Sequence, residues 1–109
     1  MSNTTNNKNN EERVYDIHKR IYDFIVSVIK LLSILPKNDA NSVIIAQLLR
    51  SVTSMGANDQ EADGALTKKD FNHLYTLVRK ESKETKFWLM LIADTNPIIT
   101  IKMEPLIQE

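Results

Sequence analysis

The chain has 109 residues, and its fourteen basic and fourteen acidic side chains give a formal net charge of zero. This length predicts a single domain with a modest core, and the balanced charge argues against a protein that attracts nucleic acid or anionic membranes through its overall field. The absence of cysteine excludes a disulfide framework and a thiolate metal site, and it fits a reduced, cytoplasmic setting.

Residues 1–11 form an Asn-rich polar segment, which we expect to be a disordered tail because it has almost nothing apolar to bury. This segment lacks the apolar stretch of a signal peptide. The longest purely apolar run, residues 87–93, is too short to span a bilayer. The sequence therefore predicts a soluble, cytoplasmic protein that does not associate with a membrane.

Residues 12–35 are predicted to form the first helix of a domain that covers residues 12–109. Apolar side chains recur there at spacings of three and four, which places them on one helix face: Val14, Ile17, Ile21, Phe24, Val28, Leu31 and Leu35. Further apolar side chains widen this stripe, as expected for a helix with neighbours on two sides: Tyr22, Ile25, Ile29 and Leu32. Pro36 should end the helix.

The second predicted helix covers residues 42–62 and follows a polar connection with two candidate caps, Asn38 and Asn41. Gly64 would close this helix in a left-handed conformation. Gly56 lies inside the helix, where glycine costs about 1 kcal/mol relative to alanine. We therefore expect the backbone of a neighbouring element to approach Gly56 closely.

The third helix is predicted over residues 67–94, and its start from Thr67 to Asp70 resembles a capping box. Its apolar positions follow a repeat of three and four residues that is typical of antiparallel bundle packing. The β-branched run 98–101 could form a strand, but a lone strand would have no partner. We favour a short fourth helix over residues 98–109, kinked or ended by Pro105. The predicted fold is an all-α, antiparallel up-and-down four-helix bundle with a short fourth helix.

No arrangement of catalytic residues stands out along the chain. Asp70 and His73 form one half of the paired motif of di-metal bundles, and the only other histidine is His18, so we expect a capping Asp and a surface His rather than a metal site. Asp59 and Asp63 are one turn apart and are expected to share a solvated acidic face. Since a phosphate-binding loop and a nucleophile elbow are also missing, the sequence predicts a non-enzymatic protein without a cofactor.

Basic side chains concentrate on the third predicted helix. Such a face could follow the phosphates of a nucleic acid, whereas Lys80 and Glu84, spaced four apart, also fit an ordinary solvated helix of mixed charge. In a ring of several copies the same stripe would repeat, and its field would be stronger than that of one chain. The candidate nucleic-acid-binding residues are Lys69, Arg79, Lys80, Lys83 and Lys86.

Polar side chains also lie on or beside the apolar stripes of the second and third predicted helices. Because buried polar groups need partners, we predict an interhelical network that fixes register or assembly geometry, in which Arg50 pairs with Glu81 or Glu84. The members of this assembly network are Arg50, Ser54, Asn58, Glu61, Glu81 and Glu84.

Many of these polar residues occur in an ordered pattern between residues 47 and 92. The pattern is carried by residues 47–62 (QLLRSVTSMGANDQEA), 69–71 (KDF) and 79–91 (RKESKETKFWLML). It resembles the bacterial four-helix bundle proteins first noticed as open reading frames in intervening sequences of 23S rRNA genes, and the resemblance extends over about residues 13–107. The accessory proteins of diversity-generating retroelements are related to this family.

The resemblance implies an antiparallel four-helix protomer that assembles with copies of itself into a ring, typically a pentamer. Its retroelement relatives bind nucleic acid and a reverse transcriptase through a basic surface, so RNA and a reverse transcriptase are the further partners that it implies. Two features depart from those relatives: this chain is neutral where they are basic, and its last helix is short, so a neighbour could complete the bundle. The positions it marks as packing and assembly residues are Arg50, Ser54, Asn58, Glu61, Glu81, Glu84 and Trp88.

Overall fold

The computed structural model describes the backbone of residues 2–97 and 105–107, and the side chains of residues 16–97 and 105–107. Three long helices account for most of them: α1 spans Ser2–Leu32, α2 spans Asp39–Asp63 and α3 spans Lys68–Thr95. Residues 105–107 form a short helical stretch, and no strand occurs in the described ranges. Within these ranges, the prediction of an all-helical fold with a short last helix is confirmed.

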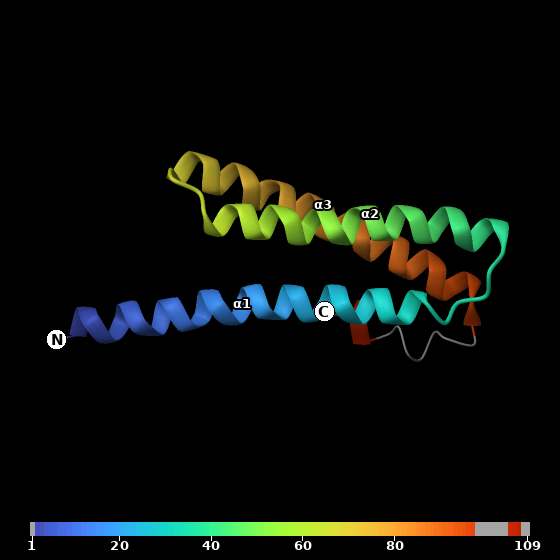
Figure 1. Ribbon diagram of the computed structural model, residues 1–109, viewed down its shortest axis with the longest axis horizontal. Coiled ribbons are helices and arrows are strands. Elements are labelled where there is room, and N and C mark those ends of the chain that lie inside the picture. Colours follow the sequence, from blue (N-terminus) through green and yellow to red (C-terminus); the bar gives the residue numbers. More distant parts are fainter. Residues whose placement is uncertain (1, 98–104, 108–109) are drawn as a thin grey trace.

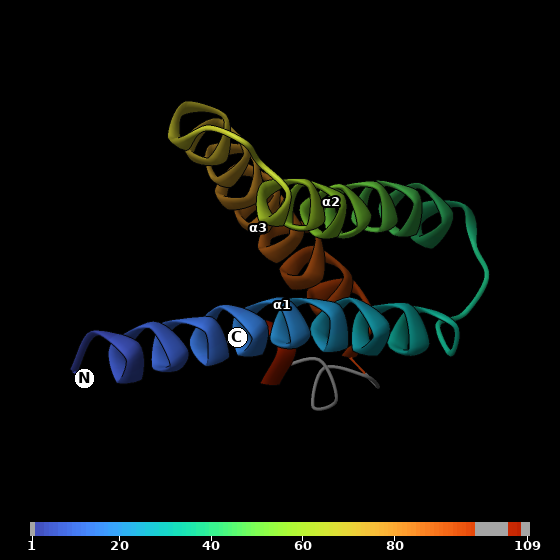
Figure 2. The same cartoon turned by 60° about the vertical axis from the view of Figure 1, so that its left-hand side comes forward.

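The chain runs out along α1, returns along α2 and runs out again along α3 (Figure 1). The α2 and α3 helices pack against each other most extensively, and α1 contacts α2 over fewer positions. In Figure 2 the beginning of α3 lies far from α1, and its end comes closer to α1. Among the residues described, none of the helices combines the length and the apolar character that crossing a membrane requires.

The later helices begin at polar caps that satisfy free backbone N–H groups. The Asn38 side chain accepts a hydrogen bond from the Asn41 N–H at 2.8 Å, so Asn38 rather than Asn41 is the cap, and α2 begins before the predicted residue 42. The Thr67 hydroxyl oxygen accepts a hydrogen bond from the Asp70 N–H at 3.1 Å, as the capping-box sequence predicts.

The helix ends differ from the predictions in two places. After Leu32 the chain continues in a turn with shorter-range hydrogen bonds, such as the 3.3 Å bond from the Leu35 N–H to the Leu32 carbonyl, because Pro36 disfavours a helical conformation in the residue before it. Gly64 has a φ of −96°, so the prediction of a left-handed cap is wrong. Gly64 keeps an ordinary negative φ, and its N–H donates a hydrogen bond to the Glu61 carbonyl at 3.1 Å.

Two predictions fall at the margins of the described residues. The α1 helix includes residues 2–11, which the sequence predicts to be a disordered tail. Because side chains before residue 16 lie outside the described ones, the tail and the domain boundary at residue 12 stay predictions. Residues 98–101, for which a strand is the alternative, and residues 102–104 before Pro105 lie outside the described residues.

All three long helices contribute to one apolar core. The short stretch adds Leu106 and Ile107, which pack against it. Several residues of the apolar stripe on α1 are only partly covered, and Ile17 is 47% exposed. The buried apolar residues are Val28, Leu32, Leu35, Ile44, Leu48, Val52, Met55, Val78, Leu89, Ile92 and Ala93.

Gly56 makes room for α1 against α2. A Cβ atom at this position would lie 2.5 Å from the Cδ1 atom of Ile25, which is far shorter than van der Waals contact between carbon atoms. A neighbouring helix therefore does approach Gly56 closely, but the prediction of a neighbouring backbone is wrong, because the group that approaches is the Ile25 side chain.

Candidate functional site

One group of polar contacts joins α2 to α3. The Arg50 guanidinium forms an ion pair with Glu84, and its Nη1 atom lies 3.6 Å from Glu81 Oε2 without making a hydrogen bond. Glu84 also accepts a hydrogen bond from Trp88 Nε1 at 3.2 Å, and Gln47 accepts one from Arg50 Nε at 3.2 Å. Arg50 is thus paired with both acidic residues that the sequence suggested, and both carboxylates turn towards α2.

A pair of buried hydroxyl groups lies between the same two helices. The Thr85 hydroxyl donates to Ser51 Oγ at 3.0 Å, and the Ser51 hydroxyl donates to the Leu48 carbonyl at 3.1 Å. Both side chains are almost fully buried. Because each hydroxyl has a hydrogen-bond partner, the pair can be buried in the core without an unpaired polar group, and neither hydroxyl is free to take part in chemistry.

The other residues of the predicted assembly network follow Arg50 along α2. Ser54 and Asn58 are half-buried, and Glu61 is exposed. Their spacing places them, with Arg50, on one face of the helix. Within the described part of the chain, none of these three side chains makes a hydrogen bond or an ion pair with another side chain. Their role in assembly stays a prediction.

A second polar cluster connects α1, α2 and α3, and sequence reasoning missed it. His18 Nδ1 lies 2.7 Å from Asp59 Oδ2, and the Tyr75 hydroxyl donates to Asp59 Oδ1 at 3.1 Å. The other ring nitrogen of His18 lies 3.3 Å from Asp63 Oδ1 without hydrogen-bond geometry. We call His18, Asp59 and Tyr75 the three-helix cluster.

The burial of Asp59 corrects a prediction. Asp59 is 1% exposed, whereas the Asp63 side chain is 60% exposed, so the two do not share a solvated face. The reason is that His18 from α1 and Tyr75 from α3 cover Asp59 and satisfy both of its carboxylate oxygens. A sequence signal existed, since His18 lies at helical spacing from the apolar residues Ile21 and Ile25.

The electrostatic environment of Tyr75 follows from this geometry. Burial, the negative charge of Asp59 and the hydrogen bond to Asp59 together raise the pKa of the Tyr75 phenol from 10.0 to about 12. Among the described residues, no group of three or more His, Cys, Asp or Glu side chains is arranged to hold a metal ion. In the cluster both carboxylate oxygens of Asp59 are hydrogen-bonded across helices, and the Nε2 atom of His18 has no hydrogen-bond partner in the described part of the chain.

We expect the raised pKa of Tyr75 to appear as a pH dependence of stability. Because the folded-state pKa lies above the unfolded value, the neutral phenol stabilises the fold; this contribution is complete below pH 10 and is lost as the pH rises through 12. Subtracting the ultraviolet titration of Tyr75→Phe from that of the wild type at 295 nm should isolate a transition near pH 12. A difference curve centred near pH 10 would show that Tyr75 lacks these contacts in solution.

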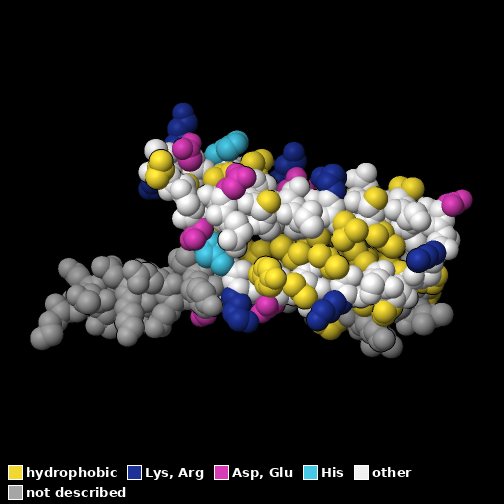
Figure 3. All heavy atoms as spheres, in the orientation of Figure 1, with side chains coloured by type: hydrophobic (Ala, Val, Ile, Leu, Met, Phe, Trp, Pro, Cys, Tyr) yellow, Lys and Arg dark blue, Asp and Glu magenta, His cyan; other side chains and the backbone are white. Residues whose placement is uncertain are grey.

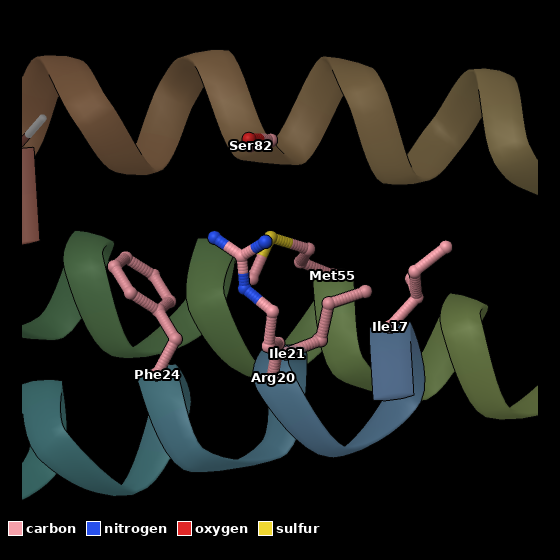
Figure 4. Close-up of a pocket in the computed structure, with 6 residues that line it drawn as sticks. All are labelled: Ile17, Arg20, Ile21, Phe24, Met55 and Ser82. Carbon is pink, nitrogen blue, oxygen red and sulfur yellow. The ribbon is translucent and has the colours of Figure 1, made fainter. Parts of the chain in front are cut away.

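Two open hollows flank α1 and leave apolar side chains uncovered. The larger, about 390 Å³, lies between α1 and α2 and includes Tyr22, Ile25 and Gly56 in its lining, and Figure 3 shows a band of hydrophobic side chains between these helices. The smaller, about 180 Å³, faces α3. In Figure 4 several α1 side chains extend towards α2, and Ser82 lies across the gap on α3. The smaller hollow is lined by Ile17, Arg20, Ile21, Phe24, Met55 and Ser82.

The outer face of α3 carries the candidate nucleic-acid-binding residues, all of which are exposed: Lys69, Arg79, Lys80, Lys83 and Lys86. Between residues 71 and 93 the only acidic side chains are Glu81 and Glu84, and both turn to Arg50 on α2. Within the described residues, Lys80 and Glu84 therefore do not form the ion pair of an ordinary mixed-charge helix. Over this stretch the charged groups on the outer face are all basic.

Comparison with known proteins gives one finding. A family model described as "23S rRNA-intervening sequence protein" matches residues 13–109. No curated protein and no solved structure matches the chain. The matched region begins within α1 and includes both groups of interhelical polar contacts and the basic face of α3.

Proposed function

The chain belongs to the family of 23S rRNA-intervening sequence proteins, and we propose that it acts as a non-enzymatic homo-oligomer. In this proposal each chain is an antiparallel four-helix-bundle protomer of a cytoplasmic ring, with five copies as the expected number. The polar groups between the helices largely pair with one another, so they hold the helices together and are not available to a substrate. The proposal therefore concerns assembly.

The uncovered apolar surface of α1 is the observation that carries this proposal. Tyr22 is 64% exposed, Ile17 47% and Ile29 43%, and the hollow between α1 and α2 remains open. Tyr22 borders the larger hollow and Ile17 the smaller one, so apolar side chains are exposed on both flanks of α1. Exposed apolar surface on a small protein marks a candidate interaction site, and its burial is favourable by roughly 25 cal/mol per Å². A second copy that covers the hydrophobic band of Figure 3 would remove it from water.

The face of α2 that carries Arg50 supports the same proposal. Ser54, Asn58 and Glu61 present hydrogen-bonding groups that have no side-chain partner within the described part of the chain. Polar groups at the edge of an apolar interface set the register and orientation of the partners more than the affinity. These residues are thus suited to define how one protomer docks on the next.

Light scattering after size-exclusion chromatography tests the assembly. We expect a mass of several times the 12.5 kDa of one chain, and Ile29→Glu should lower it because it places a charge on the exposed apolar surface of α1. Leu66→Glu is the matched control, since Leu66 is 97% exposed in the connection between α2 and α3. A wild-type monomer at micromolar concentration would contradict the proposal.

A second candidate function is nucleic-acid binding by the outer face of α3, with RNA, free or within a reverse transcriptase complex, as the partner. The observation that favours it is the charge segregation around Arg50, which draws Glu81 and Glu84 towards α2 and leaves basic groups outside. Since phosphate contacts release counterions, the affinity should fall steeply with salt.

Fluorescence anisotropy with labelled RNA at low salt tests this second function. The double variant Lys80→Glu/Lys83→Glu should weaken binding, whereas Lys30→Glu/Lys37→Glu, which changes the net charge equally at exposed positions outside α3, should weaken it much less. Absence of binding by the wild type at low salt would end this second proposal.

A further inference from the structure

An aromatic ring lies among the basic side chains of α3. Phe87 is 56% exposed, and it follows Lys83 by four residues and Lys80 by seven, so the three share one face of the helix. Met90, 46% exposed, lies near the same face. A single exposed phenylalanine is common on protein surfaces. What makes Phe87 informative is its position beside the basic residues Lys80 and Lys83, with the exposed Asp94 following seven residues later at the end of α3.

The contacts between Arg50 and Glu84 also fix the position of Trp88, the residue next to Phe87. Phe87 and Trp88 meet edge to face, with ring centroids 4.9 Å apart and an interplanar angle of 68°. Trp88 Nε1 donates to Glu84, which pairs with Arg50 on α2. The contacts from Arg50 through Glu84 to Trp88 therefore support the Phe87 ring, so that less conformational entropy is lost when a ligand stacks on it.

We propose that the outer face of α3 binds single-stranded nucleic acid, with Phe87 stacking on an unpaired base and Lys80, Lys83 and Lys86 contacting the phosphates. This inference rests on the second function proposed above and adds the form of the ligand. A duplex presents phosphates but keeps its bases stacked inside, whereas an unpaired base can stack on an exposed aromatic ring.

Charge favours a polyanion over an uncharged protein surface as the occupant of the face. Arg79, Lys80, Lys83 and Lys86 are exposed, and between residues 71 and 93 no acidic side chain faces outward with them. Covering four cations with an uncharged surface would remove them from water without compensation. A polyanion supplies a negative charge opposite each of these cations. The partner that covers the apolar surface of α1 needs no such charge.

Anisotropy titrations with two probes test the proposal: a labelled 20-nucleotide oligouridine and a labelled 20-base-pair RNA duplex, both at low salt. We expect the full chain to bind the single strand more tightly than the duplex. Phe87→Leu, which keeps an apolar side chain but removes the ring, should weaken single-strand binding roughly tenfold and leave duplex binding almost unchanged. Phe71→Leu, the same change at a 42% exposed phenylalanine near the beginning of α3, is the matched control and should change neither affinity appreciably.

The outcomes separate this inference from the function on which it rests. Equal loss of affinity for both probes in Phe87→Leu, no loss in that variant, or tighter binding of the duplex would overturn the role of Phe87, while weakening of both probes by Lys80→Glu/Lys83→Glu would still support the basic face. Binding of neither probe by the wild type would overturn both proposals. Circular dichroism of each variant checks that the helices are intact.

Discussion

Replacing Asp59 with alanine is expected to lower the free energy of unfolding by about 3 kcal/mol, because removal of one partner from a buried polar cluster leaves the others without compensation. In the wild type Asp59 is 1% exposed and accepts hydrogen bonds from His18 at 2.7 Å and from Tyr75 at 3.1 Å. The variant would leave the part-buried Tyr75 hydroxyl and His18 ring nitrogen without that acceptor. Urea denaturation followed by circular dichroism at 222 nm measures the loss.

The chain contains its own control for this result. Asp63 lies one turn further along α2 and also approaches His18, but its side chain is 60% exposed, so Asp63→Ala should cost less than about 1 kcal/mol. The double variant Asp59→Ala/Tyr75→Phe should be less destabilised than the sum of its single changes, since it no longer leaves a buried hydroxyl unpaired. Equal losses in Asp59→Ala and Asp63→Ala would show that the three-helix cluster is not formed in solution.

Replacing Asn41 with alanine should produce the second large effect, a loss of about 2 kcal/mol in the free energy of unfolding. Asn41 is 2% exposed. Its amide nitrogen donates to the Pro36 carbonyl at 2.9 Å and to Asn96 Oδ1 at 3.0 Å, and its amide oxygen accepts from Asn96 Nδ2 at 3.0 Å. These bonds join the connection between α1 and α2 to the end of α3.

An isosteric change tests whether the hydrogen bonds of Asn41 or its packing is responsible. Asn41→Asp keeps the shape but has no amide donor, so its carboxylate would face the oxygens of Pro36 and Asn96, and we expect it to be at least as destabilising as alanine. Asn72→Ala, at an exposed position on α3, should be neutral or slightly stabilising because alanine favours a helix. Thermal unfolding monitored at 222 nm compares the three, and a stable Asn41→Asp variant would contradict this account.

The helices could be predicted largely from the sequence because their signals are local. Apolar spacing identified the three long helices, and the cap at Thr67 follows from a side chain within a few residues of the backbone group that it satisfies. The errors arose where two local signals compete. Asn38 and Asn41 are both good caps by type, and the structure uses Asn38 while burying Asn41 against Asn96 at the other end of the chain.

The candidate site was predictable only in part. The pairing of Arg50 with Glu81 and Glu84 could be suggested because these residues border the apolar stripes of two helices that are consecutive in the chain. The three-helix cluster was not found, because it requires the relative positions of α1, α2 and α3, with His18 and Asp59 separated by 41 residues. The basic residues on the outer face of α3 could be predicted from the sequence. That Glu84 does not pair with them could not, because it depends on the ion pair that Glu84 forms with Arg50 on α2.

The sequence by itself determined which residues form helices, which side of each helix is apolar, and the family to which the chain belongs. Tertiary structure alone decided which polar groups are buried. Asp59 and Asp63 are the same residue type one turn apart, and their helical periodicity describes them almost identically. Periodicity sets the direction of a side chain relative to its own helix axis, whereas burial depends on where the neighbouring helices cross. Here α1 and α3 cross α2 so that His18 and Tyr75 cover Asp59 and leave Asp63 in water.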